Sequence, residues 1–308
     1  MEIKPKQITW DQIPDPIEFS ENGSHIIQGW MVQPKYDGEC CRLIIHHGFA
    51  TLQRFGKDGE AGRIKTEFYP EIIEYAIRLN LPDMVLVGEI CVLLDKYRAS
   101  FPHIQLRMNT VDKDKQKKAM KDKLATFMMF DIEEYDGKNL DKVPYGERYS
   151  LLQQVLKQKV TWKDGQPSAR IMPVKNISLG DYPDWKSFVK DHEMEGIVVK
   201  NPDKAAEQVK LKNWDEDDFK IIGTERSEAG EARGWFISKL RLEDTKGTHV
   251  NKGQQFDCKY INYPQTEQAK KDVIDKTAII KYMKMRGRDG QYLAPRHPSL
   301  VEILEFKK

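Results

Sequence analysis

The sequence predicts an α+β protein of two domains, the first built of antiparallel sheets with flanking helices and the second a small all-β barrel. The 308 residues suffice for two ordinary domains, and 39% apolar with 32% charged residues suit a globular chain with a charged surface. Strand and helix patterns are mixed up to about residue 217, whereas short β-rich runs dominate afterwards. We therefore predict domains over residues 1–217 and 218–308.

Several runs in the first domain have the pattern of strands. Residues 41–47 and 49–55 predict a hairpin, because apolar residues alternate on one face and a His-Gly pair supplies the turn. Residues 84–94 and 125–137 are near-continuous apolar runs, as expected of strands buried on both faces.

Helical patterns and two further strands complete the first domain. Residues 69–79 have helical spacing behind a proline in the first turn, and residues 145–158 predict an amphipathic helix. Residues 112–124 predict a lysine-rich helix, which we interpret first as a solvated face and second as a phosphate-contacting one. Residues 195–203 and 209–214 predict short strands.

The second domain has the pattern of a small antiparallel barrel. Four short β-rich runs at residues 219–225, 234–243, 254–260 and 300–306 are separated by Gly and Asn turns. One helix is predicted within residues 266–283. About five short strands in such a length favour an oligonucleotide-binding (OB) barrel.

Charge, cysteines and hydropathy limit the possible partners and surroundings. Residues 219–308 carry 18 Lys and Arg against 12 Asp and Glu, and the rest carries 32 against 36, which favours a polyanionic partner for the C-terminal part. The four cysteines show no CxxC spacing, which argues against a zinc-cysteine site or a disulfide framework. No apolar run reaches the length of a membrane span and the N-terminus has no apolar signal core, so we expect a cytoplasmic protein.

Charged residues in apolar strands are candidates for chemistry. Glu89 and Glu195 each stand in a strand-like apolar run, where a carboxylate needs a partner or a metal. Lys210 and Lys212 would share one face of a strand, so an anion such as a polyphosphate is expected between them. Lys35 precedes an Asp-Gly turn, which alone indicates only a hairpin.

Taken together, these segments resemble the covalent nucleotidyltransferase superfamily, and most closely the minimal two-domain ATP-dependent DNA ligases of bacteria and phages. KYDG at residues 35–38 matches the KxDG motif of the adenylated lysine, EGIVVK at 195–200 matches EGxVxK, and KLK at 210–212 matches KxK. The segments around Arg54, Glu89 and Phe130 resemble the phosphate-holding, ribose-binding and adenine-stacking strands. The resemblance implies an adenylation (nucleotidyltransferase) domain of ATP-grasp-like fold followed by an OB-fold nucleic-acid-binding domain.

The resemblance also implies roles for individual residues. The implied catalytic residues are Lys35, Asp37, Glu195, Lys210 and Lys212. The implied nucleotide-binding residues are Gln33, Lys35, Glu89, Phe130, Lys200, Lys210 and Lys212, with Glu195 and Glu89 as metal ligands. The implied DNA-binding residues are Arg54, Arg42, Lys57 and Arg296.

The implied reaction is the sealing of single-strand nicks by a monomeric DNA ligase, in replication or repair. ATP with Mg²⁺ or Mn²⁺ would adenylate Lys35, and the AMP would pass to the 5′-phosphate of nicked double-stranded DNA before the ends are joined. We expect the metal and the cations Lys200, Lys210 and Lys212 to lower the pKa of Lys35, because they favour its neutral amine.

Some positions depart from the ligase pattern and leave other functions open. Cys40 stands where the lysine motif usually carries Arg, and Val87 stands where Asp often precedes Gly-Glu. The C-terminal basic motif that orients pyrophosphate is represented only by the candidates Arg296 and Lys307. An RNA ligase or capping-type nucleotidyltransferase is one alternative, and a non-catalytic nucleic-acid-binding relative is another.

Overall fold

The structure, a computed structural model, divides into two compact units, Met1–Asn213 and Trp214–Lys308. It describes residues 6–8, 29–56, 61–108, 110, 112–157, 160–178, 180, 184–226, 237–247, 252–260, 273–284, 291 and 293–304. The boundary between residues 217 and 218 that the sequence suggests falls inside strand β14 (Asp215–Arg226), which belongs to the second unit. The predicted fold class, adenylation-type sheets with few helices followed by a closed barrel, is confirmed.

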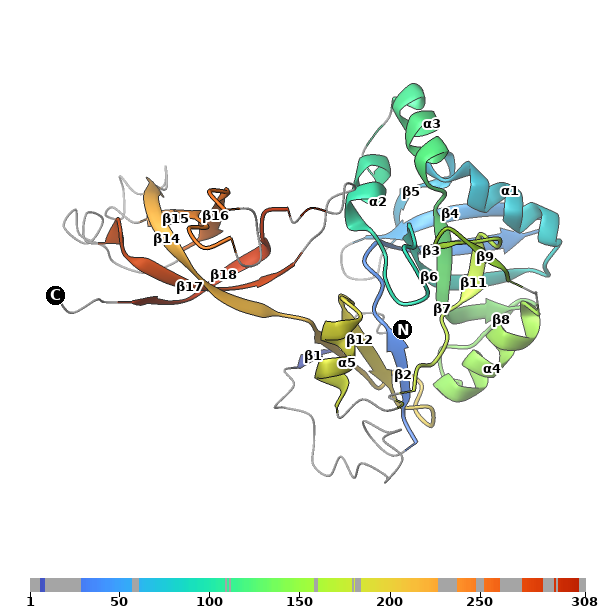
Figure 1. Cartoon of the computed structure of the whole chain (residues 1–308). Helices are drawn as coiled ribbons and strands as arrows, with labels where there is room; N and C mark the ends of the chain where they lie inside the picture. Colours follow the sequence, from blue (N-terminus) through green and yellow to red (C-terminus); the bar gives the residue numbers. More distant parts are fainter. Residues whose placement is uncertain are drawn as a thin grey trace, which may run out of the picture. The chain divides into compact units, whose positions relative to one another are not determined.

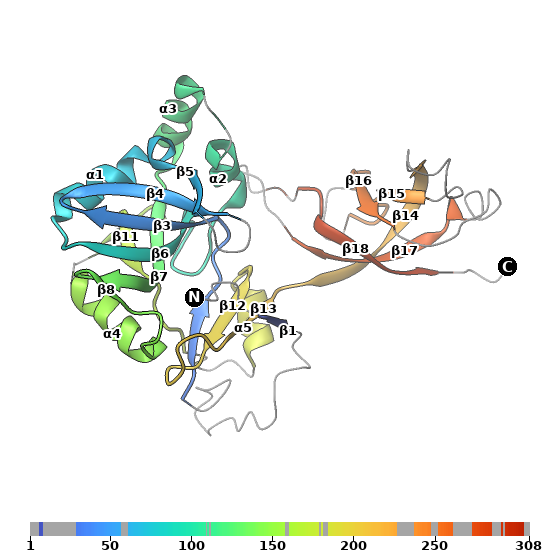
Figure 2. The same cartoon turned by 180° about the vertical axis from the view of Figure 1, so that it is seen from behind.

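A seven-stranded sheet forms most of the first unit (Figures 1 and 2). Its strands follow the order β11-β7-β6-β3-β4-β5, and β8 pairs with β7. Their bounds are β3 Glu39–His46, β4 Phe49–Phe55, β5 Ala61–Ile64, β6 Met84–Cys91, β7 Thr126–Tyr135, β8 Lys138–Asn139 and β11 Ile171–Pro173. The predicted hairpin is β3–β4, where every second residue of β3 is buried.

A smaller four-stranded sheet lies beside the first and follows the order β1-β13-β12-β2. Its strands are β1 Lys6–Ile8, β2 Met31–Pro34, β12 Gly196–Lys200 and β13 Gln208–Lys212, and a separate hairpin is formed by β9 Trp162–Lys163 and β10 Gln166–Pro167. Most pairs in the chain are antiparallel, as predicted, but β1–β13, β7–β11 and β16–β18 are parallel. The sheets are therefore mixed rather than purely antiparallel.

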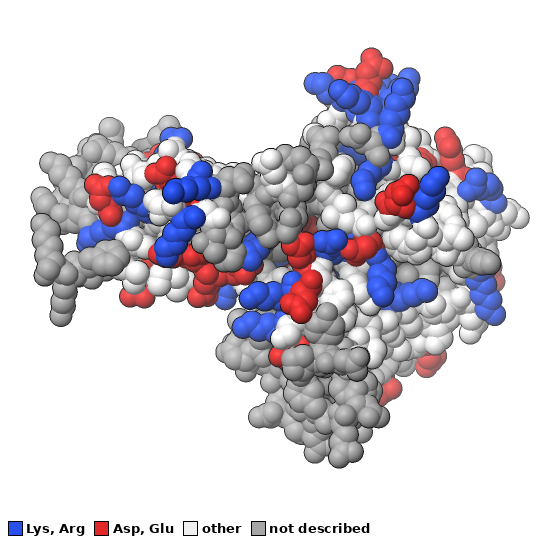
Figure 3. All heavy atoms as spheres, in the orientation of Figure 1, with Lys and Arg blue, Asp and Glu red and all other residues white. Residues whose placement is uncertain are grey.

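Helices flank the two sheets. Their bounds are α1 Pro70–Leu79, α2 Phe101–Met108, α3 Lys113–Asp122, α4 Tyr145–Val155, α5 Trp185–Asp191 and the 3₁₀ helix η3 Thr66–Phe68. Helix α1 packs against β4 and α4 against β7, and their apolar side chains close one large core on the seven-stranded sheet. The lysines of α3 are exposed and gather at one end of the unit (Figure 3). Every helix that the structure describes is too short or too polar to cross a lipid bilayer.

The second unit is a closed barrel in the order β14-β15-β16-β18-β17. Its other strands are β15 Ile237–Glu243, β16 Gln255–Lys259, β17 Thr277–Met283 and β18 Arg296–Leu304. The helix predicted within residues 266–283 is wrong for residues 277–283, which form β17 between β14 and β18. Burial there alternates, with Ala278, Ile280 and Tyr282 in the barrel core, and Asp275 has a left-handed backbone (φ 67°) that interrupts a helix.

Candidate active site

Lys35 lies where the chain passes from the small sheet to the large one. β2 ends at Pro34 and β3 begins at Glu39, so residues 35–38 form the crossing. The backbone amide of Lys35 donates to the carbonyl of Gly196 (3.0 Å), which fixes this residue beside β12. A side chain at Gly38 would collide with the backbone carbonyl of Ile90 in β6. The glycine of KYDG is thus required by the close approach of two strands.

The side chain of Lys35 is held by Glu195. Its Nζ atom lies 2.7 Å from both carboxylate oxygens of Glu195. Lys212 approaches the same carboxylate, with its Nζ 3.5 Å from Oε1. Gly196, which pairs with Lys212 across β12 and β13, has no room for a Cβ against the carbonyl of Leu211. The sequence-predicted residues Lys35, Glu195 and Lys212 therefore meet at one point.

The pKa of Lys35 is raised in the chain without a metal, whereas the sequence predicts a lowered pKa with the metal bound. Burial lowers this pKa, but Glu195, Glu89 and Asp37 raise it by more. The carboxylates outweigh burial because Glu195 is in direct contact with Nζ, so Lys35 is a charged ammonium in this state. The sequence showed the cations of the site but not which partner would contact the lysine.

Glu89 lies in β6 beside this cluster, and its surroundings fit a cation. Burial raises the pKa of Glu89 to about 8, opposed by Lys35 and reinforced by Glu195, Asp37 and Glu39. More carboxylates than lysines thus influence this position, and their oxygens are the ligand type that Mg²⁺ prefers. Glu195, Glu89 and Asp37 thus surround Lys35 with groups of the type that binds a divalent cation, although their ligand atoms do not all lie within 4.8 Å of one another.

Lys200 is held away from Lys35 by the strand that contains Phe130. It is 4% exposed, and its Nζ donates to the carbonyl oxygen of Phe130 (3.0 Å). The same atom lies over the rings of Phe130 and Tyr145, at 4.8 and 4.2 Å from their centroids. Burial lowers the pKa of Lys200 to about 8, because no carboxylate is in direct contact with it.

Tyr145 and Asn176 join this group, and sequence reasoning missed both. The hydroxyl of Tyr145 donates to the Phe130 carbonyl (2.9 Å) and accepts from Gln33 Nε2 (2.9 Å). Gln33 also donates to Asn176 Oδ1 (3.2 Å). Tyr145 opens α4, and no motif in the sequence indicated that this helix would reach the side chain of Gln33. We call Gln33, Phe130, Tyr145, Asn176 and Lys200 the Phe130 cluster.

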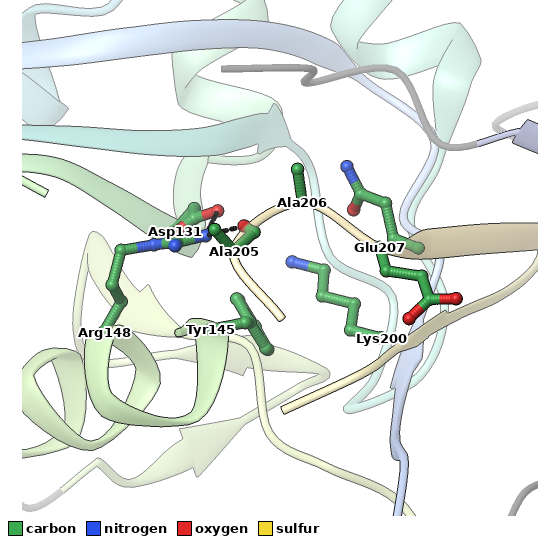
Figure 4. A pocket seen from close by; sticks show the side chains of 8 residues that line it. Asp131, Tyr145, Arg148, Lys200, Ala205, Ala206 and Glu207 are labelled. Atoms are coloured by element: carbon green, nitrogen blue, oxygen red, sulfur yellow. Dashed lines mark hydrogen bonds and ion pairs between the residues drawn. The ribbon is translucent and has the colours of Figure 1, made fainter. Parts of the chain in front are cut away.

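A pocket adjoins the Phe130 cluster (Figure 4). Its lining residues are Asp131, Tyr145, Arg148, Lys200, Ala205, Ala206, Glu207 and Gln208. Arg148 pairs with both carboxylate oxygens of Asp131 (2.7 and 3.0 Å) and donates to the carbonyl of Ala205 (2.9 Å). This buried pair thereby ties the loop after β12 to β7 and fixes the wall of the pocket.

Arg42 and Arg54, two predicted DNA-binding residues, lie in the neighbouring strands β3 and β4. Arg54 is about half exposed (53%), and its Nε is 3.8 Å from Oε1 of the buried Glu39. Glu39 is contacted more closely by Lys65 (2.8 Å) and by the hydroxyl of Tyr69 (2.9 Å). Arg54 can therefore turn its guanidinium toward a ligand while a buried carboxylate remains beside it.

Arg42 is occupied by protein contacts, and Cys40 is partly buried. The Arg42 guanidinium pairs with Glu133 (2.6 Å) and lies over the ring of Phe55 (4.0 Å). Burial raises the pKa of the Cys40 thiol, so this position is neutral where an arginine would carry a positive charge. A role for Arg42 in DNA binding stays a prediction.

The remaining predicted basic residues lie elsewhere. Lys57 and Lys307 lie outside the described residues. Arg296 begins β18 in the barrel unit, where it pairs with Met283 of β17. Lys210 lies in β13 on the same face as Lys212, opposite Val198.

Comparison with known proteins gives a consistent result. The model of the family described as "ATP dependent DNA ligase domain" matches residues 20–214. The bifunctional non-homologous end joining protein LigD of Bacillus subtilis is 28% identical over 194 residues, which is 60% of this chain and 30% of that protein. A DNA ligase of Natronomonas pharaonis is 26% identical over 224 residues, 69% of this chain and 38% of that one. The matched region thus spans about a third of the length of these relatives.

Solved structures share the fold over nearly the whole chain. A structure from a study of DNA binding by Lig E DNA ligases, described as a minimal scaffold, superposes with a TM-score of 0.58 at 14% identity. The likeness covers 98% of this chain and 100% of that one. At this identity it demonstrates the fold, including the barrel unit that the family model does not cover.

Proposed function

The chain belongs to the ATP-dependent DNA ligase family, and we propose that it seals single-strand nicks in double-stranded DNA by way of an adenylated Lys35. The observation that carries the proposal is the contact of Lys35 Nζ with Glu195 (2.7 Å), with Lys212 on the same carboxylate. The lysine motif, the EG motif and the KxK motif are brought together there. The end-joining relative favours a role in DNA repair.

In the first step, Lys35 attacks the α-phosphate of ATP. A bond forms between Nζ and phosphorus, the bond to pyrophosphate breaks, and pyrophosphate leaves. Because Lys35 is an ammonium in the free protein, it must first lose a proton. Lys210 and Lys212 lie on one face of β13 and would hold the charge of the α-phosphate.

The nucleotide would be held by the Phe130 cluster and Glu89. Phe130 offers a ring for stacking on adenine, and Lys200 and Tyr145 fix its backbone carbonyl. Gln33 is oriented by Tyr145 and Asn176, so its amide oxygen is available to a donor on the base. Glu89 would accept from the ribose hydroxyls or share in metal binding.

Glu195 and Glu89, with Asp37 beside them, would hold Mg²⁺ or Mn²⁺. When bound, this metal would neutralise negative charge on the phosphates of ATP. A cation on Glu195 would also withdraw this carboxylate from Lys35. The contact that raises the pKa of Lys35 would thereby be weakened, and the neutral amine favoured.

The AMP would then pass to the 5′-phosphate of a nick, and the 3′-hydroxyl would attack that phosphate and release AMP. The half-exposed Arg54 suits the 5′-phosphate, because its planar guanidinium can bind two oxygens at once. Arg42, Lys57 and the barrel residue Arg296 would add phosphate contacts. We assign adenylation to the first unit and sequence-independent DNA binding to the barrel unit, residues 214–308, which carries 18 Lys and Arg against 16 Asp and Glu. We propose that the enzyme acts as a monomer.

Nick sealing tests this function directly. The purified full chain is incubated with ATP, Mg²⁺ and a 5′-labelled nicked DNA duplex, next to an all-RNA nick and the Lys35→Ala variant. We expect sealing of DNA by the wild type and none by the variant. An AMP adduct on Lys35 without DNA sealing would redirect the proposal to an RNA substrate. Absence of both sealing and adduct would refute a ligase function.

A further inference from the structure

A cluster of metal-ligand residues lies at the turn of the β3–β4 hairpin. His46 ends β3, and His47 and Gly48 form the turn with left-handed backbones (φ 49° and 77°). Such two-residue turns favour Asn-Gly, so a histidine in the left-handed conformation is unusual there. The two imidazole rings are exposed, and their centroids lie 4.0 Å apart with the ring planes tilted by 38°.

The third member, Asp83, is fixed so that one oxygen faces both rings. Its Oδ1 accepts from the backbone amide of His47 (2.7 Å), and its own carbonyl accepts from the amide of Asp136 (2.8 Å). Its Oδ2 lies 2.8 Å from Nδ1 of His46 and 3.7 Å from Nδ1 of His47. Hydrogen bonds that orient a ligand in this way are typical of metal sites.

These separations suit a zinc ion. With zinc–ligand bonds of about 2.0–2.1 Å, ligand atoms of a tetrahedral site are separated by about 3.3 Å, between the two distances found here. Two imidazoles and one carboxylate form a ligand set that zinc commonly takes, with water in the open position. Among the residues that the structure describes, this is the one group of three such side chains whose ligand atoms lie within 4.8 Å of one another.

The cluster is separate from the active site. β3 extends from Glu39, next to the Lys35 turn, to His46 at its other end, a rise of about 23 Å at 3.3 Å per residue. β4, β3 and β6 are neighbours in the seven-stranded sheet (Figure 1), and Asp83 directly precedes β6. A metal held by these three residues would link the hairpin to the start of β6.

We propose that His46, His47 and Asp83 form a zinc site that fastens the β3–β4 hairpin to β6. The site adds to the proposed ligase function without taking part in it. Zinc displaces the proton on Nδ1 of His46, which leaves to solvent or moves to Nε2, so the bound imidazole is neutral with its proton on Nε2. The shared carboxylate oxygen then becomes a metal ligand, and a cross-link between neighbouring strands results.

The test measures zinc binding by the untagged full chain after treatment with a chelator. Isothermal titration with Zn²⁺ and the visible absorption of bound Co²⁺ are compared for the wild type, His46→Asn and Asp83→Asn. The matched control is His297→Asn, which removes an exposed histidine with a left-handed backbone (φ 52°) in the barrel unit. Circular dichroism verifies that each variant is folded.

We expect the wild type and His297→Asn to bind one equivalent of Zn²⁺ that both cluster variants lose, or bind at least about tenfold more weakly. Zinc should also raise the midpoint temperature of thermal unfolding of the wild type, and it should not raise that of His46→Asn. Nick sealing without zinc should be equal in His46→Asn and wild type. Equal zinc binding by all four proteins, or a Co²⁺ spectrum unchanged in the cluster variants, would overturn the proposal.

Discussion

Two lysines of the first unit, the partly buried Lys35 and the buried Lys200, have opposite pKa shifts. Burial lowers the pKa in both cases. Lys35 contacts the carboxylate of Glu195, and its pKa ends above the usual value. Lys200 contacts a backbone carbonyl and two aromatic rings, and its pKa falls to about 8. The difference shows that a carboxylate in direct contact offsets the effect of burial on the pKa of Lys35, whereas burial determines the direction of the shift for Lys200.

The largest effect is expected from Lys35→Arg. Arginine retains the positive charge that pairs with Glu195, but its guanidinium stays protonated and is a poor nucleophile. We expect the fold to persist and self-adenylation to fall by at least about 10³-fold, measured as transfer of label from α-labelled ATP to the protein. A nicked duplex that already carries AMP on its 5′-phosphate should still be sealed, which separates loss of the nucleophile from loss of the site. Label on the variant protein at the wild-type rate would contradict this role.

Glu195→Gln should have the next largest effect. The amide leaves Lys35 and Lys212 facing each other without a counter-charge, and it removes a ligand of the proposed Mg²⁺ site. We expect the rate of self-adenylation to fall by about 10²-fold, as for loss of one electrostatic contact in other enzymes. Glu193→Gln, two residues away and paired with Arg98 on the surface, is the control and should be unchanged. Equal rates in the two variants would refute the role of Glu195.

Lys200→Met tests the lowered pKa of Lys200 through its effect on the free energy of unfolding. The pKa of Lys200 is about 8 in the folded chain and 10.5 in the unfolded chain, so folding opposes its protonation. The folded state is destabilised by about 3 kcal/mol below pH 8, where Lys200 is protonated in both the folded and the unfolded chain. This destabilisation decreases as the pH rises toward 10.5. The stability of Lys200→Met relative to wild type should therefore be greatest at pH 7 and decline by pH 10, measured by urea unfolding.

The control for that experiment is Lys186→Met, on the exposed side of α5. Its stability relative to wild type should not vary between pH 7 and pH 10. If the difference for Lys200→Met were equally flat, the lowered pKa would be wrong, and the two lysines would not differ in the way described.

Tyr145→Phe should have the smallest effect. The ring remains, but the hydroxyl that joins Gln33 to the Phe130 carbonyl is lost. Lys200 still donates to that carbonyl and Asn176 still accepts from Gln33. We therefore expect the binding free energy of ATP to weaken by only about 1 kcal/mol. The KM for ATP should rise a few-fold. An unchanged KM would separate this tyrosine from nucleotide binding.

The residues that surround Lys35 were predicted from the sequence better than those that surround Lys200. KYDG, EG and KLK are local patterns, and the strands that hold them place Lys35, Glu195 and Lys212 together as expected. The raised pKa of Lys35 in the chain without a metal was not predicted, because it depends on a contact between residues far apart in the chain. Tyr145 and Asn176 were missed because neither belongs to a recognisable motif.

In the fold, too, elements set by local sequence patterns were predicted correctly, whereas an element that depends on pairing with distant strands was not. The β3–β4 hairpin and the helices α1 and α4 followed from periodicity and a proline, and they are present. β17 was taken for a helix because a short apolar run fits both periods, and its pairing with β14 and β18 decides the outcome. The domain boundary was predicted where short β-rich runs begin to dominate, but the acidic residues just before that point already belong to strand β14.

The connection between the two units has a mechanical consequence. β13 ends at Lys212 and β14 begins at Asp215, so Asn213 and Trp214 alone separate the strands. The backbone amide of Asn213 donates to the carbonyl of Glu195 (2.8 Å), and its side chain donates to the carbonyl of Met194 (3.2 Å). Asn213 therefore fastens the start of this connection to the segment that carries Glu195, so the candidate site and the link to the second unit share the same backbone hydrogen bonds.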